Sequence, residues 1–271
     1  MRTAIIIPAR FASSRFPGKP LAPLICADGV VRPAISQTWA AARAAAAALP
    51  GDVDLVIATD SGEIADTCRA LGIAVVMTPE ACLNGTERCA AALPQLQATP
   101  DLVVNLQGDA PLTPADMVAA VVMLAAERSD LAMATAVVPA TPTVLAHLQA
   151  DAAAGRVGGT TAVCARDGRA LYFSKAIIPH IPPGTQPEQP VLLHVGLYAY
   201  RPAALLAYAA AGPCPLELQE GLEQLRFLDA GLPIGVAQCA APPWDLIELN
   251  NPGDVPLIEA QLQARARAEM N

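Results

Sequence analysis

Basic side chains stand close together near the start of the chain, at Arg10, Arg15 and Lys19. They follow a β-branched run that predicts a buried strand, and the prolines and glycine around them predict a loop. Little side-chain bulk separates the charges at Ala9, Ala12, Ser13 and Ser14, so the loop backbone can approach a polyphosphate while the cations neutralise charge. An ordinary solvated basic turn is the alternative interpretation.

A carboxylate stands at the end of another predicted strand. Residues 102–106 read LVVNL, which predicts a buried central strand, and Asp109 follows after a short turn. This is where a Mg²⁺ ligand for a nucleoside triphosphate is expected. The alternative role is to cap the next helix, but Thr113 and Pro114 already supply that start signal.

The elements that must position these residues alternate along the chain. The pattern predicts a helix over 36–49, a strand over 53–58, a helix over 63–71 and a strand over 73–77. Such alternation is typical of a parallel sheet with right-handed crossovers, so the fold class is α/β. Ligands of such sheets bind beyond the carboxyl ends of the strands, so we expect the basic loop and Asp109 at one edge.

The second half of the chain departs from this alternation. Residues 160–165 and 169–174 flank an Asp-Gly pair, which predicts a hairpin and therefore a mixed sheet or a small lobe. An amphipathic helix is predicted over 216–228. We expect a single domain over residues 1–271, with 155–200 contributing the hairpin lobe and a ligand-binding strand.

The residues of the basic loop, IIPARFASSRFPGKPL, resemble the opening motif of the cytidylyltransferases that activate 3-deoxy-manno-octulosonate (Kdo). Further segments match this CMP-Kdo synthetase family in its order: residues 84–88, 107–112, 170–179, 193–201, 222–226 and 248–254. The resemblance implies a three-layer αβα, nucleotide-diphospho-sugar-transferase-like (Rossmann-like) mixed sheet with a hairpin or dimerisation lobe.

The resemblance also implies roles for individual residues. The implied nucleotide-binding residues are Ala9, Arg10, Arg15, Lys19, Gly85, Thr86 and Arg88, with Arg10, Lys19 and Asp109 catalytic. The implied sugar-acid ligands are Gln107, Lys175, His194, Tyr198, Glu223 and Gln224, and the implied metal ligands are Asp109 and Asn250.

Structural roles also fit several of these residues. Gly85 and Thr86 fit a turn and a helix cap. His194 and Tyr198 share one face of a strand by its period of two, which suits either a ligand or packed aromatic rings. Glu223 also fits a surface ion pair.

The chain departs from the family's pattern at four positions. Ala110 replaces a glutamate, Thr161 a lysine, Lys175 an arginine and Asn250 an aspartate. Lysine keeps the charge of arginine but loses its bidentate geometry. An amide oxygen ligates Mg²⁺ without contributing charge. The changes at Ala110, Thr161 and Lys175 leave a different sugar acid open as the substrate, and Asn250 leaves open a non-catalytic nucleotide-binding subunit.

Composition excludes several classes of function. The net charge is −8 and no basic stretch is interleaved with aromatic residues, so we expect no nucleic-acid partner. The seven cysteines form no C-x-x-C pair, which argues against a zinc site and a disulfide framework. No apolar run approaches the length of a membrane span. Without a basic-then-apolar leader at the N-terminus, we expect a cytoplasmic protein, and the resemblance implies a homodimer.

The expected reaction couples CTP to a 2-keto-3-deoxy sugar acid, Kdo first, and releases pyrophosphate with Mg²⁺ as cofactor. Its implied place is the synthesis of lipopolysaccharide or capsule precursors. One alternative is transfer to another acid, such as an amino-Kdo, another ulosonate, a sialic-type acid or a phosphonate. A second is a non-catalytic nucleotide-binding subunit.

Overall fold

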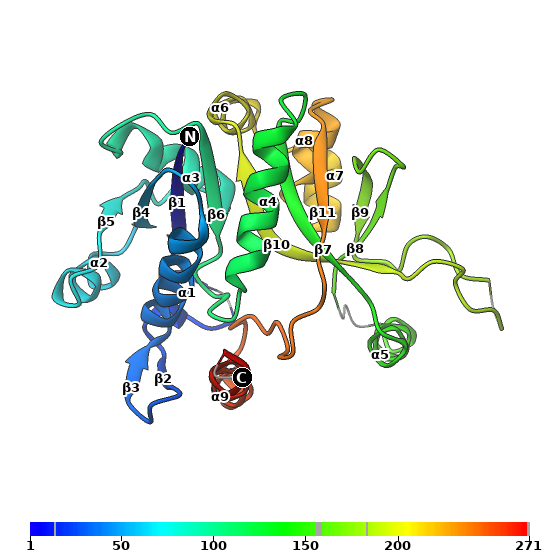
Figure 1. The fold of residues 1–271 in the computed structure, drawn as a ribbon, viewed down its shortest axis with the longest axis horizontal. Coiled ribbons are helices and arrows are strands. Elements are labelled where there is room, and N and C mark those ends of the chain that lie inside the picture. The colour runs from blue at the N-terminus through cyan, green and yellow to red at the C-terminus, as the bar shows by residue number, and fades with distance from the viewer. Residues whose placement is uncertain (14, 156–158, 183, 270–271) are drawn as a thin grey trace. The chain divides into compact units, whose positions relative to one another are not determined.

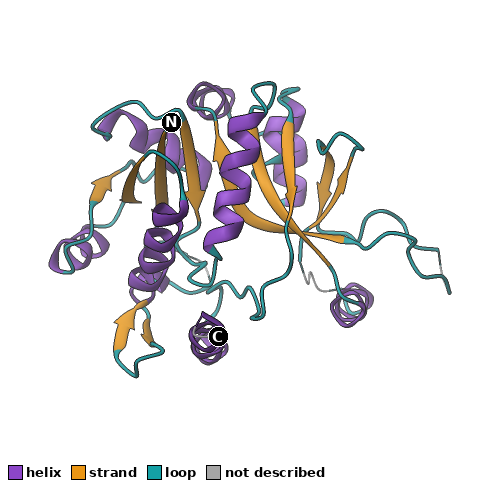
Figure 2. Ribbon diagram, in the orientation of Figure 1, coloured by secondary structure: helices purple, strands orange, loops and turns teal. Residues whose placement is uncertain are grey.

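The computed structural model describes residues 1–13, 15–155, 159–182 and 184–269. The chain folds into two compact units, which we call unit 1 (Met1–Ala119 with Pro242–Asn271) and unit 2 (Ala120–Ala241). Both have the mixed α/β composition that the sequence predicts (Figures 1 and 2). Ser14 of the basic loop and residues 156–158 of the predicted lobe lie outside the described residues. The single domain over 1–271 stays a prediction.

Parallel strands form the sheet of unit 1, in the order β6-β1-β4-β5. Their bounds are β1 Arg2–Ala9, β4 Asp52–Thr59, β5 Val75–Met77 and β6 Leu102–Leu106. Ile5, Ile6 and Ile7 are fully buried, and so is every residue of β6. Such continuous apolar runs are typical of strands covered on both faces, which is the arrangement seen here.

Helices cover both faces of this sheet. Their bounds are α1 Ala34–Ala48, α2 Gly62–Ala70 and α3 Gly85–Ala92. The chain moves outward from β1 through β4 to β5 and then returns to β6. Right-handed crossovers therefore place α1 and α2 on one face and α3 on the other, as Figure 1 shows.

The C-terminal segment returns to the N-terminal part of unit 1. Helix α9 (Val255–Glu269) packs on β2 (Pro23–Ile25), which forms a small antiparallel pair with β3 (Val31–Pro33). Leu24, Ile258 and Leu262 share one buried cluster. The Ile25 amide also donates to the Glu259 carboxylate at 2.7 Å. This packing anchors the turn before α9, where Asn250 lies.

Unit 2 contains a mixed sheet in which β7 pairs with β11 in parallel and with β10 antiparallel. The strands are β7 Met133–Pro139, β8 Thr161–Cys164, β9 Ala170–Ser174, β10 Leu192–Tyr200 and β11 Ile234–Gln238. The helices are α5 Pro142–Ala153, α6 Pro202–Ala211, α7 Pro215–Glu220 and α8 Leu225–Asp229, and α4 (Ala115–Glu127) leads in from unit 1. β8 and β9 form the predicted hairpin, with Gly168 left-handed in its turn.

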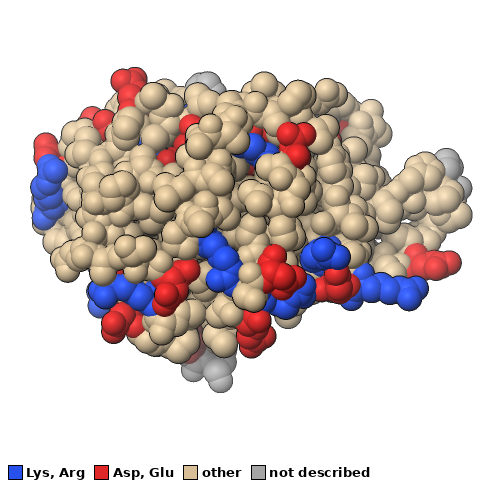
Figure 3. Space-filling model, turned by 90° about the horizontal axis from the view of Figure 1, so that it is seen from above, with Lys and Arg blue, Asp and Glu red and all other residues tan. Residues whose placement is uncertain are grey.

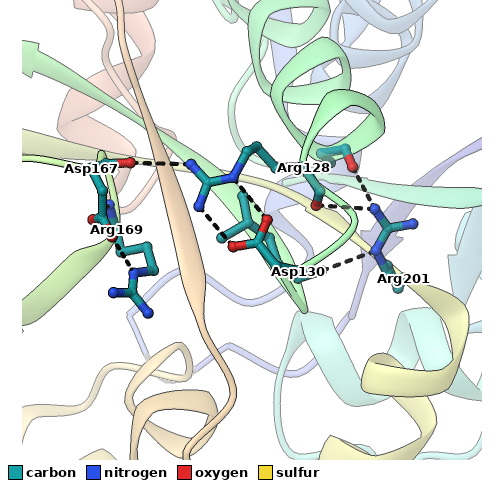
Figure 4. A network of polar contacts seen from close by, with 7 residues as sticks. Arg128, Asp130, Asp167, Arg169 and Arg201 are labelled. Carbon is teal, nitrogen blue, oxygen red and sulfur yellow. Dashed lines mark hydrogen bonds and ion pairs between the residues drawn. The ribbon is translucent and has the colours of Figure 1, made fainter.

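The end of α4 is tied to the rest of unit 2 by arginines (Figure 4). Arg201 donates to the carbonyl oxygens of Ala125 at 2.8 Å and Arg128 at 3.1 Å, which satisfies acceptors that a helix end leaves unpaired. Arg128 pairs with Asp130 at 2.7 Å and donates to the carbonyl of Asp167 in the hairpin turn at 3.1 Å. Polar contacts therefore join α4 to the hairpin.

The prediction of one helix over 216–228 is wrong. The chain forms α7 and α8 instead, with Gly221 between them at a φ of 64°. A glycine in this left-handed conformation ends a helix, because residues with a side chain adopt it only at a cost. The apolar periodicity persists across the break, which is why the pattern predicts a continuous helix.

The face of the molecule seen in Figure 3 is sparsely charged. On the face seen in Figure 3, most atoms belong to uncharged residues, and basic side chains lie beside acidic ones. No helix within the described ranges is both long and apolar enough to cross a bilayer.

Candidate functional site

The opening loop, residues 10–20, is folded back on itself at the end of β1. The Gly18 amide donates to the Phe11 carbonyl at 2.9 Å, and Gly18 is left-handed with a φ of 68°. The Phe11 amide donates to the Asp60 carboxylate, at the end of β4, at 3.3 Å. These contacts hold a loop on which Arg10 and Arg15 are exposed to solvent.

Lys19 and Asp109 form an ion pair between this loop and the turn after β6. Their side chains are only 15% and 20% exposed, so solvent screens the attraction less than at the surface. The structure thus brings together two residues that the sequence assigns to catalysis.

Glycine determines how closely the turn that carries Asp109 approaches β1. The Gly108 amide donates to the Pro8 carbonyl at 3.2 Å, and a Cβ at Gly108 would lie 2.6 Å from the same oxygen. On its other side, the Thr38 hydroxyl of α1 donates to the Gly108 carbonyl at 3.0 Å. A side chain at position 108 would therefore push Asp109 away from the opening loop.

The turn before α9 reaches the same place. The Leu249 amide donates to the Asp109 carbonyl at 2.8 Å, which sets Asn250 beside the opening loop. Arg15 donates to the Asn250 side-chain oxygen at 3.0 Å. Asp254 is used to hold the turn, because its carboxylate accepts from the Asn250 and Asn251 amides. Asn250 thus lies next to both predicted nucleotide and metal residues.

The start of α3 packs against Gln107. Asn84 caps this helix by accepting from the Glu87 amide at 2.9 Å. A Cβ at Gly85 would lie 3.0 Å from Gln107 Nε2 and 3.2 Å from the Pro8 ring, so glycine permits this close approach. Thr86 is fully buried behind it. Gly85 and Gln107 therefore lie together at the predicted edge.

Arg88 is buried beneath the loop instead of facing solvent. It donates to the Asp60 carboxylate at 2.7 Å and to the Thr78 hydroxyl at 2.7 Å, and the ion-paired side chains are 3% and 10% exposed. Because Asp60 also accepts from Phe11, this pair supports the opening loop. Its direct nucleotide contact stays a prediction. Sequence reasoning missed Asp60, although its place after a strand was a signal.

A second group of predicted residues gathers in unit 2. The ring centroids of His194 and Tyr198 are 5.5 Å apart, and those of His194 and Phe173 are 5.0 Å apart. The predicted shared face of this strand is confirmed by these contacts, although β10 bulges between Val195 and Tyr198. Burial, and then the charge of Lys175, lowers the pKa of His194 to about 3. His194 is therefore neutral at neutral pH.

The hydrogen bonds of His194 indicate its tautomer. Thr135 Oγ1 lies 2.9 Å from His194 Nε2 and 2.7 Å from the Leu197 carbonyl oxygen. The carbonyl accepts only, so we assign the single hydroxyl proton to it and a proton on Nε2 to the bond with Thr135. In this neutral ring Nδ1 is an acceptor. Thr135 is a second residue that the sequence does not single out.

Gln224 is 1% exposed, and only the oxygen of its side-chain amide has a hydrogen-bond partner among the described residues. Its side-chain oxygen accepts from the Tyr198 hydroxyl at 3.3 Å, while its Nε2 has no partner among the described residues. A buried amide nitrogen without a partner is costly, and a ligand oxygen would satisfy it. Glu223 precedes it and is half-buried. This arrangement supports a polar ligand near Tyr198 and Gln224.

The predicted sites thus separate by unit. All the predicted nucleotide and metal residues lie in unit 1 together with Gln107, and the other predicted sugar-acid residues lie in unit 2.

The sequence model described as cytidylyltransferase matches residues 4–234. The chain belongs to this family. A 3-deoxy-manno-octulosonate cytidylyltransferase of Maricaulis maris is 41% identical over 238 residues, 87% of each chain. One of Myxococcus xanthus is 39% identical over 267 residues, covering 97% of this chain and 98% of its own. Among solved structures, a CMP:2-keto-3-deoxy-manno-octonic acid synthetase complexed with CTP has a TM-score of 0.80, 28% identity and complete coverage of both chains.

One departure from the pattern of the CMP-Kdo synthetases has a structural role in this member. Thr161 is buried, donates to the Ala176 carbonyl at 2.6 Å and accepts from the Ile178 amide at 3.2 Å. It therefore ties the hairpin to the segment after Lys175. Nothing in the structure explains why Ala110 replaces the family's glutamate.

The donors near Asp109 suit a cation that brings its own ligands. The described ranges contain no group of three or more His, Cys, Asp or Glu side chains that could hold a metal. Asp109 supplies a carboxylate and Asn250 an amide oxygen on neighbouring segments, and in this structure these groups accept from Lys19 and Arg15 respectively. Mg²⁺ typically takes one or two protein oxygens together with substrate phosphates and water. The residues present therefore fit a magnesium–nucleotide complex better than a free ion.

Proposed function

We propose that this chain transfers CMP from CTP to Kdo and releases pyrophosphate. The observation that carries the proposal is the pairing of Lys19 with Asp109 beside the exposed Arg10 and Arg15. It sets cations and one carboxylate at the carboxyl ends of β1 and β6, where α/β sheets bind ligands. The names of the relatives support Kdo as the acceptor, and the CTP complex of the similar solved structure supports CTP as the donor.

In this mechanism the anomeric hydroxyl of the sugar acid attacks the α-phosphate in line. A new oxygen–phosphorus bond forms as the bond to pyrophosphate breaks, and the hydroxyl proton passes to solvent. Arg10, Arg15 and Lys19 neutralise the triphosphate and the departing pyrophosphate. Asp109 and Asn250 would hold Mg²⁺, which when bound supplies charge neutralisation and lowers the pKa of a nearby hydroxyl.

The residues of unit 2 would orient the sugar acid. Lys175 supplies positive charge for the carboxylate of the sugar acid, and this charge also contributes to the lowered pKa of His194. The unsatisfied amide nitrogen of Gln224 would donate to a sugar oxygen, with Tyr198 and Glu223 beside it. Gln107 of unit 1 is the remaining proposed ligand.

Pyrophosphate release tests the proposal. The assay uses CTP, Mg²⁺ and Kdo. Parallel assays replace CTP with ATP, GTP or UTP, or replace Kdo with N-acetylneuraminate. Turnover confined to CTP with Kdo is the expected result. CTP binding without pyrophosphate release from any acid would overturn the enzymatic assignment and indicate a nucleotide-binding subunit.

A different sugar acid is the second candidate, because Lys175 replaces an arginine and Thr161 is committed to the hairpin. A single ammonium recognises a carboxylate with less geometric specificity than a guanidinium. Activity with an amino-Kdo, another ulosonate, a sialic-type acid or a phosphonate, and none with Kdo, would select this candidate.

We also propose a cytoplasmic homodimer that supplies CMP-Kdo for lipopolysaccharide or capsule synthesis, on the family resemblance. Light scattering of the purified chain tests the dimer, and a monomeric mass would contradict it.

A further inference from the structure

Helix α7 carries two glutamates one turn apart, Glu217 and Glu220, that face different neighbours. Glu217 is 9% exposed and accepts two hydrogen bonds from Arg226 of α8, at 2.6 and 2.7 Å. The Tyr208 hydroxyl also donates to Glu217, at 3.2 Å, and the Arg226 guanidinium lies over the Tyr208 ring, 3.9 Å from its centroid. A buried, bidentate pair of this kind holds α7 and α8 in one geometry.

This pair determines where Gln224 lies. Gln224 is the residue that precedes α8, and Arg226 is the second residue of that helix. Because Gly221 interrupts the helical backbone between α7 and α8, helix geometry alone does not fix the position of Gln224. The Glu217–Arg226 pair supplies the missing constraint.

Glu220 also accepts hydrogen bonds on both of its carboxylate oxygens, from residues at the end of β9. One of its carboxylate oxygens accepts from the Ser174 hydroxyl at 2.8 Å, and the other accepts from the Lys175 amide at 2.8 Å. The Ser174 hydroxyl in turn accepts from the Ala176 amide at 3.0 Å. The two oxygens of Glu220 therefore fix the backbone at Lys175, one directly through its amide and the other through the Ser174 side chain.

We propose that Glu220 is a positioning residue that aligns Lys175 with the carboxylate of the sugar acid, with α7 linking this anchor to Gln224. The inference rests on the proposed function, which assigns Lys175 to that carboxylate. A lysine side chain is flexible, and fixing its backbone limits where its ammonium reaches. The charge of Glu220 itself opposes an anionic substrate. Geometry and charge therefore predict opposite effects when Glu220 is neutralised.

The test compares Glu220→Gln with the parent enzyme. Glutamine keeps the size but replaces one acceptor oxygen with a donor, so the charge-assisted bond from the Ser174 hydroxyl is replaced by a neutral bond of reversed direction. We expect the KM for Kdo to rise about tenfold, the loss expected for one charge-assisted hydrogen bond, while kcat and the KM for CTP stay unchanged. An unchanged or lower KM for Kdo would overturn the proposal. Glu127→Gln, at the exposed end of α4, is the matched control.

Two further measurements separate positioning from general damage. The carboxamide analogue of Kdo lacks the charge that Lys175 recognises, so parent and Glu220→Gln should use it equally well. A penalty that persists with the analogue would overturn the proposal. Ser174→Ala removes one contact with a smaller change, and we expect a rise in the KM for Kdo there too; no rise would count against the proposal. Absence of turnover by the parent with Kdo would instead reject the proposed function.

Discussion

Lys19 and Asp109 are paired across 90 residues of sequence, one in the opening loop and the other in the turn after β6. Each compensates the charge of the other in a place that is largely shielded from solvent. The pair therefore links the proposed phosphate-binding residues directly to the proposed metal-binding residues.

Replacing Asp109 with asparagine should abolish most turnover. Asn keeps the size but removes the charge, so Lys19 loses its counter-ion and the proposed cation loses its carboxylate. We expect kcat/KM to fall at least about 100-fold at saturating Mg²⁺, while calorimetry still detects CTP binding through the cations. Asp66→Asn, in an exposed ion pair on α2, serves as the control. Intact turnover would show that Asp109 does not hold the metal.

Gly108→Ala should damage the site through the backbone. The new methyl group would meet the Pro8 carbonyl at 2.6 Å, which forces the turn and Asp109 to move. We expect a loss of kcat/KM larger than about tenfold, since catalysis is sensitive to displacements near 1 Å. Gly62→Ala, where a Cβ meets nothing within 4 Å, should keep full activity. Equal activity of the two variants would contradict this account of Gly108.

Arg88→Met should destabilise the fold. The substitution leaves Asp60 buried without its cation, and breaking one side of a buried pair costs about 3 to 5 kcal/mol of unfolding free energy. The same change at Arg69, in an exposed pair, should cost less than about 1 kcal/mol. Chemical denaturation measures both. Similar losses at the two positions would show that the Arg88–Asp60 pair adds little to stability.

His194 should make stability depend on pH in mildly acidic solution. Its pKa is lowered from 6.5 to about 3 by burial and by Lys175, so below pH 6.5 the unfolded chain binds a proton that the folded chain does not. Unfolding free energy should therefore fall as pH drops from 6.5, by at most about 1.4 kcal/mol per pH unit. His194→Asn should flatten this dependence.

The window from pH 6.5 to 4.5 isolates this effect. Asp28 and Asp130, whose pKa values are lowered from 3.8 to about 2 by their arginine partners, lose their contribution only at lower pH. A parent protein whose denaturation midpoint stays constant over the window would contradict a neutral His194 with a lowered pKa.

Much of the fold follows from local sequence patterns. The buried runs of β1 and β6 and the alanine-rich α1 are predictable because apolar periodicity and helix propensity act within a few residues. The opening loop and Asp109 are likewise predictable as neighbours, because the carboxyl ends of parallel strands share one edge. Sequence motifs alone were enough to indicate the cytidylyltransferase family.

The tertiary structure alone decided which side chains face each other. Arg88 carries the same charge as Arg10, yet it is buried on Asp60 because the ends of β4 and α3 meet in space. Gly221 separates two helices although the apolar pattern runs through it, because its backbone lies in the left-handed region. Glu220 contacts Ser174 and Lys175 from 46 and 45 residues away. Such pairings depend on distances between segments remote in the chain, which local periodicity and propensity do not encode.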